Sequence, residues 1–245
     1  MDLSLGFYDE ETVTASFEEL KKLLTFLKKL DRPHPVITGG WAVYAYEKGL
    51  GSRDIDIVMV SEADIIQYLY NHYFPAYNFN VKKIGLIPDH YEKIVKTKDG
   101  PRDIIIDVFD GEKEWRDAVN LGIHFQWSWT IEFQEQKKID NLEIFVPKRE
   151  LLIITKIMAA VARTKENDIA PHYRLPPKIL KDYRDVAALT VGKRLEFDFY
   201  KKYMEKSNGK QYLDDFLARY RQPEYGEFLT NLGGNFEEIN SKLGM

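Results

Sequence analysis

The spacing of hydrophobic and polar positions divides the chain into a first part of mixed elements and a second part that is almost wholly helical. Ser16 and Glu19 form a Ser-x-x-Glu pattern before apolar residues at helical spacing, which predicts a capped helix over residues 16–30. Strict alternation of apolar and polar residues over 124–134 predicts a half-buried strand. Further strands are predicted over residues 35–38, 54–60, 79–87, 91–98, 101–111 and 141–148, and helices over 41–49 and over 61–74, the latter with Ser61 as its N-cap.

Pro147 marks the change to a helical pattern. Helices are predicted over residues 148–164, 178–190, 194–206 and 210–221 and in the tail, with a proline-rich loop over 167–178. The expected fold class is therefore α+β: a mixed β-sheet flanked by helices, followed by an all-helical C-terminal part. The expected domains are residues 1–147 and 148–245.

Two carboxylates interrupt the apolar strand over 54–60. Asp54 and Asp56 project to one face with Cα atoms ~6.5–7 Å apart, so they repel each other, and burial of either charge is costly. Two divalent cations bound by this pair and by a third carboxylate would compensate both the repulsion and the cost of burial. Ligands that are all oxygen atoms favour Mg²⁺ or Mn²⁺. Asp107 lies in a similar apolar strand and is the chosen third ligand, with Asp103 as the fallback. The alternative is an exposed edge strand whose carboxylates pair with Arg53 or a lysine.

A glycine turn lies shortly upstream of these carboxylates. Gly39 and Gly40 follow a short strand and precede a helix, where backbone N–H groups can approach a phosphate closely. The thirteen residues 41–53 are enough for one helix and a turn. We therefore expect the chain to return beside the first strand and to bring the glycine turn next to Asp54 and Asp56.

Composition narrows the classes of function. The chain has no cysteine, which excludes disulfides, thiolate nucleophiles and Cys-ligated zinc, and its net charge of −4 gives no overall basic surface for nucleic acid. The first residues are acidic and no apolar run approaches the ~20 residues of a membrane span, so a cytoplasmic protein is expected. No phosphate-binding loop, dinucleotide fingerprint or serine-hydrolase motif is present, and the five histidines show no metal-ligand spacing.

The order Gly39-Gly40, thirteen residues, "DIDI" and a later "IDV" resembles the signature of the nucleotidyltransferase superfamily with the DNA polymerase β-like fold. The resemblance implies that Asp54, Asp56 and Asp107 bind two divalent metal ions and that the glycine pair contacts a nucleoside triphosphate, ATP among them. Many members have Gly-Ser where this chain has Gly-Gly, so this chain lacks the serine hydroxyl that would contact the phosphates at that position.

The helical part adds a second, weaker resemblance. Lys156, Ala159 and Arg163 match the Lys-x-x-Ala-x-x-x-Arg of the abortive-infection type (AbiEii-like) nucleotidyltransferase toxins. Lys156 and Arg163 are seven residues apart and share a helix face, which suits a triphosphate, although an ordinary solvated face is the alternative. "KDYRDV" supplies Asp182 and Asp185 where that family has Arg-Asp-x-x-Asp, and it departs by having Lys181 for the arginine. The role of the two aspartates stays open.

The expected activity is transfer of NMP from an NTP to an acceptor hydroxyl, with release of pyrophosphate. Phosphates would be held by Thr38, Gly39, Gly40, Ser52, Arg53, Lys156 and Arg163. The acceptor is left open between tRNA and a protein, as in a toxin with a cognate antitoxin, and a small antibiotic-type molecule. A tRNA acceptor predicts a basic patch, for which Lys82, Lys83, Lys93, Lys96 and Lys98 are the candidates. The remaining alternatives are an inactive nucleotide-binding member of a paired system and a nuclease.

Overall fold

The computed structural model describes residues 8–30, 34–59, 63–84, 87–115 and 120–244. The chain forms two compact units that alternate along the sequence. Among the described residues, the sheet unit comprises those within 8–113 and 127–147, and the helical unit comprises those within 114–126 and 148–244. Residues 114–126 thus group with the helices, while the division of the chain at 147 stays a prediction.

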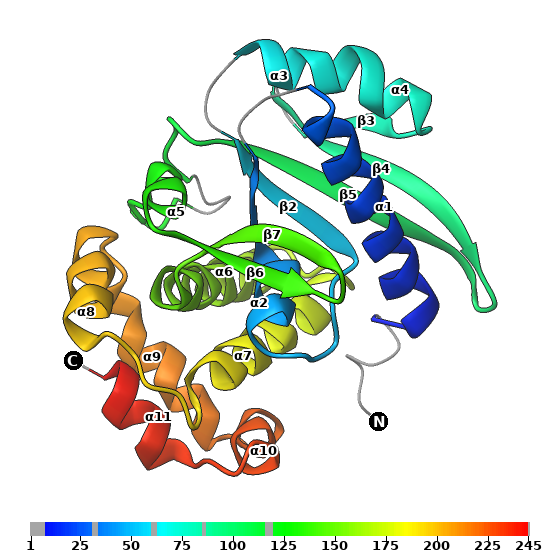
Figure 1. The fold of residues 1–245 in the computed structure, drawn as a ribbon. Coiled ribbons are helices and arrows are strands. Elements are labelled where there is room, and N and C mark those ends of the chain that lie inside the picture. Colours follow the sequence, from blue (N-terminus) through cyan, green and yellow to red (C-terminus); the bar gives the residue numbers. More distant parts are fainter. Residues whose placement is uncertain (1–7, 31–33, 60–62, 85–86, 116–119, 245) are drawn as a thin grey trace. The chain divides into compact units, whose positions relative to one another are not determined.

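The sheet unit is built on a seven-stranded sheet with the order β3-β4-β5-β2-β1-β7-β6 (Figure 1). The pairs β2·β5 and β1·β7 are parallel and the other neighbours are antiparallel, so the predicted mixed sheet is confirmed. The strands are β1 (Val36–Thr38), β2 (Asp54–Met59), β3 (Asn80–Ile84), β4 (Ile87–Thr97), β5 (Gly100–Asp110), β6 (Gln134–Ile139) and β7 (Leu142–Pro147).

The two faces of the central strands differ in polarity. In β2 the buried Ile55 and Ile57 alternate with the half-buried Asp54 and Asp56. Helix α1 (Glu10–Lys28) covers the isoleucine face, because its Glu19 pairs with Lys93 of β4 at 2.8 Å, and Lys93 lies on that face by register with Ile104. The carboxylates of β2 therefore lie on the face opposite to α1.

The first helix begins earlier than predicted. Asp9 is its N-cap, and the carboxylate of Asp9 accepts a hydrogen bond from the Thr12 N–H at 2.8 Å. Ser16 lies buried inside α1, where its Oγ accepts a hydrogen bond from Trp41 Nε1 at 3.1 Å. The predicted capping box at Ser16 is therefore wrong, since an earlier acidic cap starts the helix and the serine is used in packing. Ser61, the predicted cap of the third helix, lies outside the described residues.

The predicted strand over 124–134 is also wrong. Burial at period two persists through Ile123, Phe125 and Trp127, but these residues pair with no neighbouring strand beyond a single bridge between Glu114 and Gln126 within the described chain. The segment then turns into α5 (Ser128–Glu132), where the Thr130 hydroxyl donates to the Trp127 carbonyl at 2.7 Å. The alternation of apolar and polar residues correctly indicated which side chains are buried. It carries no information on whether the segment has a neighbouring strand to pair with.

The remaining short helices of the sheet unit connect its strands. They are α2 (Gly39–Tyr46), α3 (Ala63–Tyr68), the π-helical turn η1 (Leu69–Tyr73) and α4 (Phe74–Ala76). Strand β6 was not predicted, because most of its side chains are polar, as expected at an exposed sheet edge.

The second part of the chain is helical, as predicted. Its two longest helices, α6 (Arg149–Ile169) and α7 (Leu175–Thr190), pack along each other. Helix α7 begins before its predicted start at 178, since prolines are tolerated in a first helical turn. The others are α8 (Phe197–Lys206), η2 (Lys210–Tyr212), α9 (Leu213–Ala218), η3 (Arg219–Arg221), α10 (Pro223–Asn231) and α11 (Phe236–Leu243). Among the described residues, none of the helices combines the length and the apolar character needed to cross a bilayer.

Candidate functional site

Three neighbouring strands bring polar side chains into one row on the face opposite to α1. Thr38 of β1 is the Cα partner of Asp56 in β2, and Asp56 is the Cα partner of Asp107 in the parallel strand β5. Paired residues of adjacent strands lie ~4.7–4.9 Å apart in the direction of the hydrogen bonds and project to the same face. Asp56 and Asp107 are therefore direct neighbours, although 51 positions separate them in the sequence.

Gly39 brings the backbone of the glycine turn against the Asp56 carboxylate. Gly39 has a φ of +61°, and a Cβ atom added there would lie 1.9 Å from Asp56 Oδ2. Only glycine fits both the left-handed backbone and this close approach. The expected adjacency of the glycine turn and the carboxylate pair is present, and Gly40 and Thr38 lie buried beside it.

Arg53 forms an ion pair near the start of β2 and β5. It is buried, and its NH2 group donates to Asp103 Oδ1 at 2.7 Å and to the Asp103 carbonyl at 3.2 Å. This ion pair joins the loop before β2 to the first half of β5. Asp103, the fallback third carboxylate, is thus partnered by an arginine, whereas Asp107 lies in the row of Asp56. Ser52, next to Arg53, is also buried.

The donor atoms of the site suit a hard divalent cation, but the side chains are not drawn together. Asp54, Asp56 and Asp107 supply only oxygen ligands from one sheet face, the kind that Mg²⁺ and Mn²⁺ prefer. Within the described residues, no three acidic, histidine or cysteine side chains converge closely enough to form a ready metal-binding group. The residues fit such an ion by chemistry and register, and binding would require their carboxylates to rotate toward one another.

One acidic neighbour of the row was not found from the sequence. Glu92 of β4 is buried and is the Cα partner of Ile105, which is itself the partner of Asp54. Glu92 therefore projects to the carboxylate face, two strands away from Asp54. The alternation of residues along β4 shows that Glu92 lies on the opposite face from its neighbours in the sequence. Placing Glu92 on the carboxylate face also requires the register of β4 on β5, which cannot be read from the sequence.

The helical unit holds the predicted phosphate ligands Lys156 and Arg163 in a network of buried ion pairs. Lys156 Nζ lies 3.0 Å from Asp182 Oδ1 and 2.8 Å from Asp185 Oδ2. The second oxygen of Asp182 pairs with Arg163 NH1, and Lys181 Nζ lies 2.8 Å from Asp185 Oδ2. The side chain of Lys156 is only 9% exposed and that of Arg163 is 33% exposed, so Arg163 is the member that reaches solvent.

The protonation states of this network follow from burial and pairing. Burial alone would lower the pKa of Lys156, but the Asp185 and Asp182 carboxylates outweigh it and raise the pKa above its usual value. Burial would raise the pKa of Asp182, but Arg163 and Lys156 outweigh it and hold the pKa below its usual value. Burial, together with the charge of Lys156, lowers the pKa of Lys181 despite the nearby Asp185. Lys156 and Asp182 are therefore charged at neutral pH.

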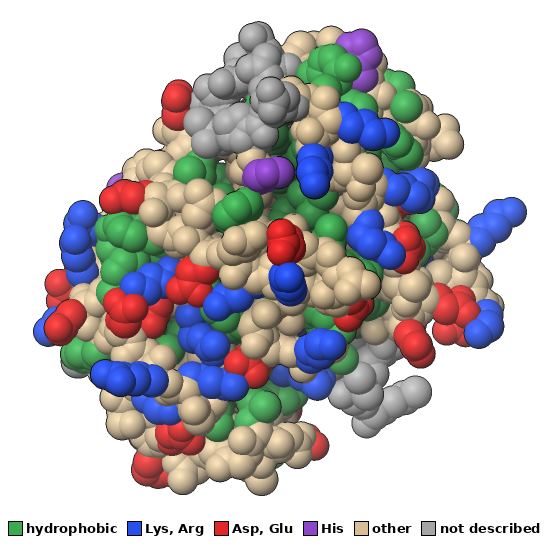
Figure 2. All heavy atoms as spheres, viewed as in Figure 1, with side chains coloured by type: hydrophobic (Ala, Val, Ile, Leu, Met, Phe, Trp, Pro, Cys, Tyr) green, Lys and Arg blue, Asp and Glu red, His purple; other side chains and the backbone are tan. Residues whose placement is uncertain are grey.

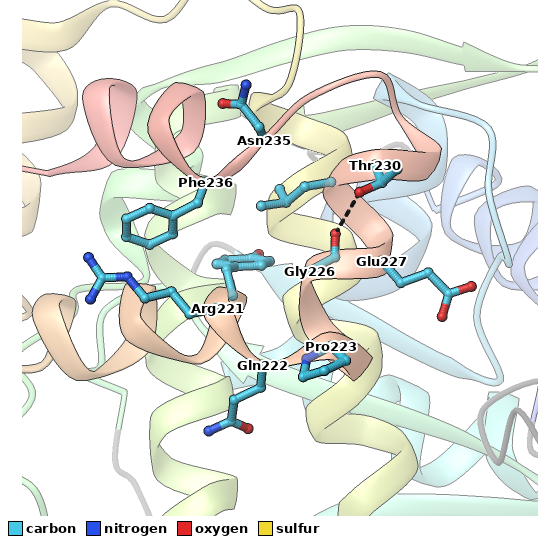
Figure 3. Close-up of a pocket in the computed structure, with 10 residues that line it drawn as sticks. Arg221, Gln222, Pro223, Gly226, Glu227, Thr230, Asn235 and Phe236 are labelled. Atoms are coloured by element: carbon cyan, nitrogen blue, oxygen red, sulfur yellow. Dashed lines mark hydrogen bonds between the residues drawn. The ribbon is translucent and has the colours of Figure 1, made fainter.

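The helical unit also contains a cavity of about 410 Å³ that was not predicted from the sequence (Figure 3). It lies among η3, α10 and the start of α11. The Arg221 guanidinium lies 4.4 Å from the centre of the Phe236 ring on one side, and the Thr230 hydroxyl donates to the Gly226 carbonyl at 3.4 Å on another. None of the predicted site residues lines this cavity.

The chain was compared with protein families, curated proteins and solved structures, and a similarity was found only among the solved structures. No protein-family model matches the chain, and no curated protein matches it. Among solved structures, the chain is similar to the crystal structure of an antigenic nucleotidyltransferase-like protein from Paracoccidioides brasiliensis. The sequences are 15% identical, the match covers 93% of this chain and 94% of the other, and the TM-score is 0.49.

Proposed function

We propose that the protein is a metal-dependent nucleotidyltransferase. The observation that carries the proposal is the row of Thr38, Asp56 and Asp107 on three adjacent strands, with the Gly39 backbone against the Asp56 carboxylate. Two carboxylates that face a glycine turn at a strand-to-helix junction suit a cation-bound triphosphate better than they suit a structural ion pair. The order of these residues along the chain is the one that resembles the nucleotidyltransferase superfamily.

In this reaction, an acceptor hydroxyl attacks the α-phosphorus of an NTP. A new P–O bond forms, the bond to the bridging oxygen of the leaving group breaks, and pyrophosphate departs. Asp54, Asp56 and Asp107 would hold divalent cations, which neutralise charge on the phosphates when bound. Asp107 would accept the hydroxyl proton, while Thr38, Gly39, Gly40 and Ser52 would position the phosphates.

The cationic residues divide into two groups in this proposal. Arg53 pairs with Asp103, so we assign it the task of fixing the loop before β2, with any phosphate contact secondary. Arg163 is the more exposed of the two predicted cations on α6 and is the better candidate for direct contact with the triphosphate, with its planar fork suited to phosphate oxygens. Lys156 would act mainly through the network that holds it.

The charge distribution favours an RNA acceptor that contacts the helical unit. Residues 148–245, which form most of the helical unit, carry 18 Lys and Arg and 14 Asp and Glu, a formal charge of +4, and the unit's segment 114–126 carries −1. Residues 8–113 and 127–147 of the sheet unit carry a formal charge of −6. Figure 2 shows Lys and Arg side chains gathered, with acidic ones among them, over the area that α8 and α9 occupy in Figure 1. In the predicted patch on the sheet unit, Lys93 pairs with Glu19 and Lys98 with Glu11, which weakens it.

The activity can be tested by incubating the protein with each α-³²P-labelled NTP, Mg²⁺ or Mn²⁺, and total RNA. The expected result is label in RNA, lost in Asp56→Asn. Asp110→Asn is the matched control, since Asp110 ends β5 on the opposite face from Asp107 and should leave transfer intact. Label that persists in Asp56→Asn would contradict the assignment of the site.

The same assay separates the competing functions. Label in protein or in a panel of hydroxylated antibiotics, with none in RNA, identifies the protein or small-molecule acceptor. NTP binding without any transfer identifies an inactive nucleotide-binding member of a paired system, and RNA cleavage without NTP identifies a nuclease. A toxin role predicts that expression stops cell growth, that Asp56→Asn restores it, and that a cognate antitoxin also restores it.

A further inference from the structure

Two cavities of the sheet unit adjoin the second half of α1. The smaller, of about 260 Å³, is lined by α1 and by Tyr77, which follows α4. The larger, of about 410 Å³, is lined by α1, by residues just before β1 and by the hairpin of β6 and β7. The exposed Thr25 of α1 borders both cavities, so a single ridge of the helix separates them. Because α1 covers the sheet face opposite to Asp56, both cavities are distinct from the carboxylate site.

Each cavity has aromatic side chains in its wall. In the larger one, the centres of the His34 and Phe145 rings lie 5.6 Å apart with 26° between the ring planes, and His34 is exposed. In the smaller one, Phe26 and Tyr77 line the wall, and the ring of Tyr73 supports both at 5.0 and 4.5 Å between centres. Rings that are held by other rings offer a planar face on which a nucleobase can stack. Both volumes lie near the lower end of the range for ligand pockets, which suits a single base in each.

Four lysines from the second half of α1 and its C-cap border the two cavities: Lys21, Lys22, Lys28 and Lys29. Lys21 pairs with Glu18, while Glu19 takes both Lys22 and Lys93 at 2.8 Å, so one carboxylate serves two cations. In the part of the chain that the structure describes, Lys28 and Lys29 form no ion pair. Figure 2 shows Lys and Arg side chains along the area that α1 occupies in Figure 1, with acidic ones among them. This surface therefore carries an excess of positive charge, although the sheet unit as a whole is acidic.

We propose that the two cavities and the lysines of α1 bind single-stranded RNA, with one base in each cavity and the phosphates on the lysines. Two pockets on either side of a helix are too widely separated for one small anion, whereas a flexible strand can place a base in each. A duplex hides the faces of its bases, and an acidic peptide would leave the aromatic walls without a stacking partner. The site anchors the RNA acceptor on the face opposite to Asp56, and it rests on the proposed function only for this role.

Binding is measured by fluorescence anisotropy with labelled oligo(U) and oligo(A) about 12 nucleotides long. EDTA is present and NTP is absent, so the carboxylate site takes no part. Lys28→Gln with Lys29→Gln should raise Kd about tenfold. It should also reduce the slope of log Kd against log salt by about 1.4, since each phosphate contact of a single strand contributes about 0.7. Lys48→Gln with Lys113→Gln is the matched control, because these exposed lysines of the sheet unit line neither cavity, and it should raise Kd less than about threefold.

The stacking part of the site is tested separately. His34→Ala should raise Kd about tenfold and leave the salt slope unchanged, because it removes a ring and no phosphate contact. His72→Ala is the matched control, since His72 is also exposed, lies 4.2 Å from the Tyr68 ring centre and lines neither cavity. Circular dichroism checks that each variant is folded, as expected for exposed positions.

The outcomes separate this inference from the proposed function. It is overturned if the wild type does not bind the oligonucleotides, if either variant matches its control, or if duplex RNA or polyglutamate binds as tightly as the single strand. Any of these results, with transfer of label from NTP intact, overturns the inference alone. Single-strand binding that depends on His34 and the two lysines, without transfer from any NTP, supports the RNA site and overturns the proposed function.

Discussion

At the scale of single residues, Gly39 is the tightest constraint in the candidate site. Its hydrogen atom faces Asp56 Oδ2 at a place where any side chain would collide, and its φ of +61° is disfavoured for other residues. The sequence indicated this glycine as a turn residue near a phosphate. The sequence also predicted that this turn lies next to Asp54 and Asp56, whereas the atomic contact between Gly39 and Asp56 depends on the register of β1 on β2 and could not be predicted.

Gly39→Ala should therefore do more than strain the backbone. We expect it to displace the Asp56 carboxylate and to abolish transfer, and to lower the free energy of unfolding by about 1–3 kcal/mol more than Gly192→Ala does. Gly192 is the matched control, since its φ is +67° and nothing lies within 4 Å of an added Cβ. Urea unfolding and the transfer assay check both parts. Equal destabilisation by the two changes would show that the collision with Asp56 is relieved at no cost.

Asp182 also makes stability depend on pH. Arg163 and Lys156 hold its pKa in the folded protein below the ordinary value of 3.8, so the stabilisation is fully present above pH 3.8 and is lost as the pH falls through the folded pKa. The unfolding free energy of the wild type should fall more steeply from pH 5 to pH 3 than that of Asp182→Asn. Asp9, whose pKa is also lowered, is common to both proteins and cancels in the difference. Parallel curves would contradict this assignment.

At the scale of elements, the ion pairs of Lys156 hold α6 against α7. Lys156→Met should lower the free energy of unfolding by about 3–5 kcal/mol, because it leaves Asp182 and Asp185 buried with fewer partners. Lys242→Met is the matched control, since its pair with Glu238 on α11 is partly exposed and should contribute less than about 1 kcal/mol. Chemical denaturation of both variants measures the difference. Similar small losses would mean that the helix pair relies on its apolar contacts alone.

The elements also show where sequence patterns are sufficient. β2 and β5 were found from their runs of apolar residues, and α6 because its apolar face continues through Ala162. The strand predicted over 124–134 failed because α5 uses the same residues with a buried Thr130 at helical spacing. Local pattern determines which residues are buried, whereas strand pairing and the choice of helix cap depend on residues far away or earlier in the chain.

At the scale of the whole molecule, the candidate residues come from both units. Thr38, Asp56 and Asp107 belong to the sheet unit, and Lys156 and Arg163 belong to the helical unit. The sequence predicted the residue types and their order, since charge chemistry is visible in it. It could not predict that Lys156 is enclosed by Asp182 and Asp185, because that depends on the packing of α7 on α6.

A nucleotide bound at the candidate site should stabilise the unit that binds it. At an NTP concentration of 100 times Kd with Mg²⁺, we expect a gain of about 2.7 kcal/mol and a rise in Tm of roughly 5–10 °C. Mg²⁺ alone should raise the Tm less, because the described carboxylates are not gathered into a ready metal site and the phosphates must supply further ligands. EDTA should reverse the rise, and Asp56→Asn should abolish it.

The effect on each unit tests whether both take part in binding. If the units unfold in separate transitions, a nucleotide held by the row of Thr38, Asp56 and Asp107 should raise the midpoint of the sheet unit. A rise in the midpoint of the helical unit that Arg163→Ala removes would assign Arg163 to the nucleotide site. Differential scanning calorimetry with and without NTP resolves the two cases. A shift confined to the sheet unit in the wild type would remove Arg163 and Lys156 from the nucleotide site, because a ligand stabilises only the structure that it binds.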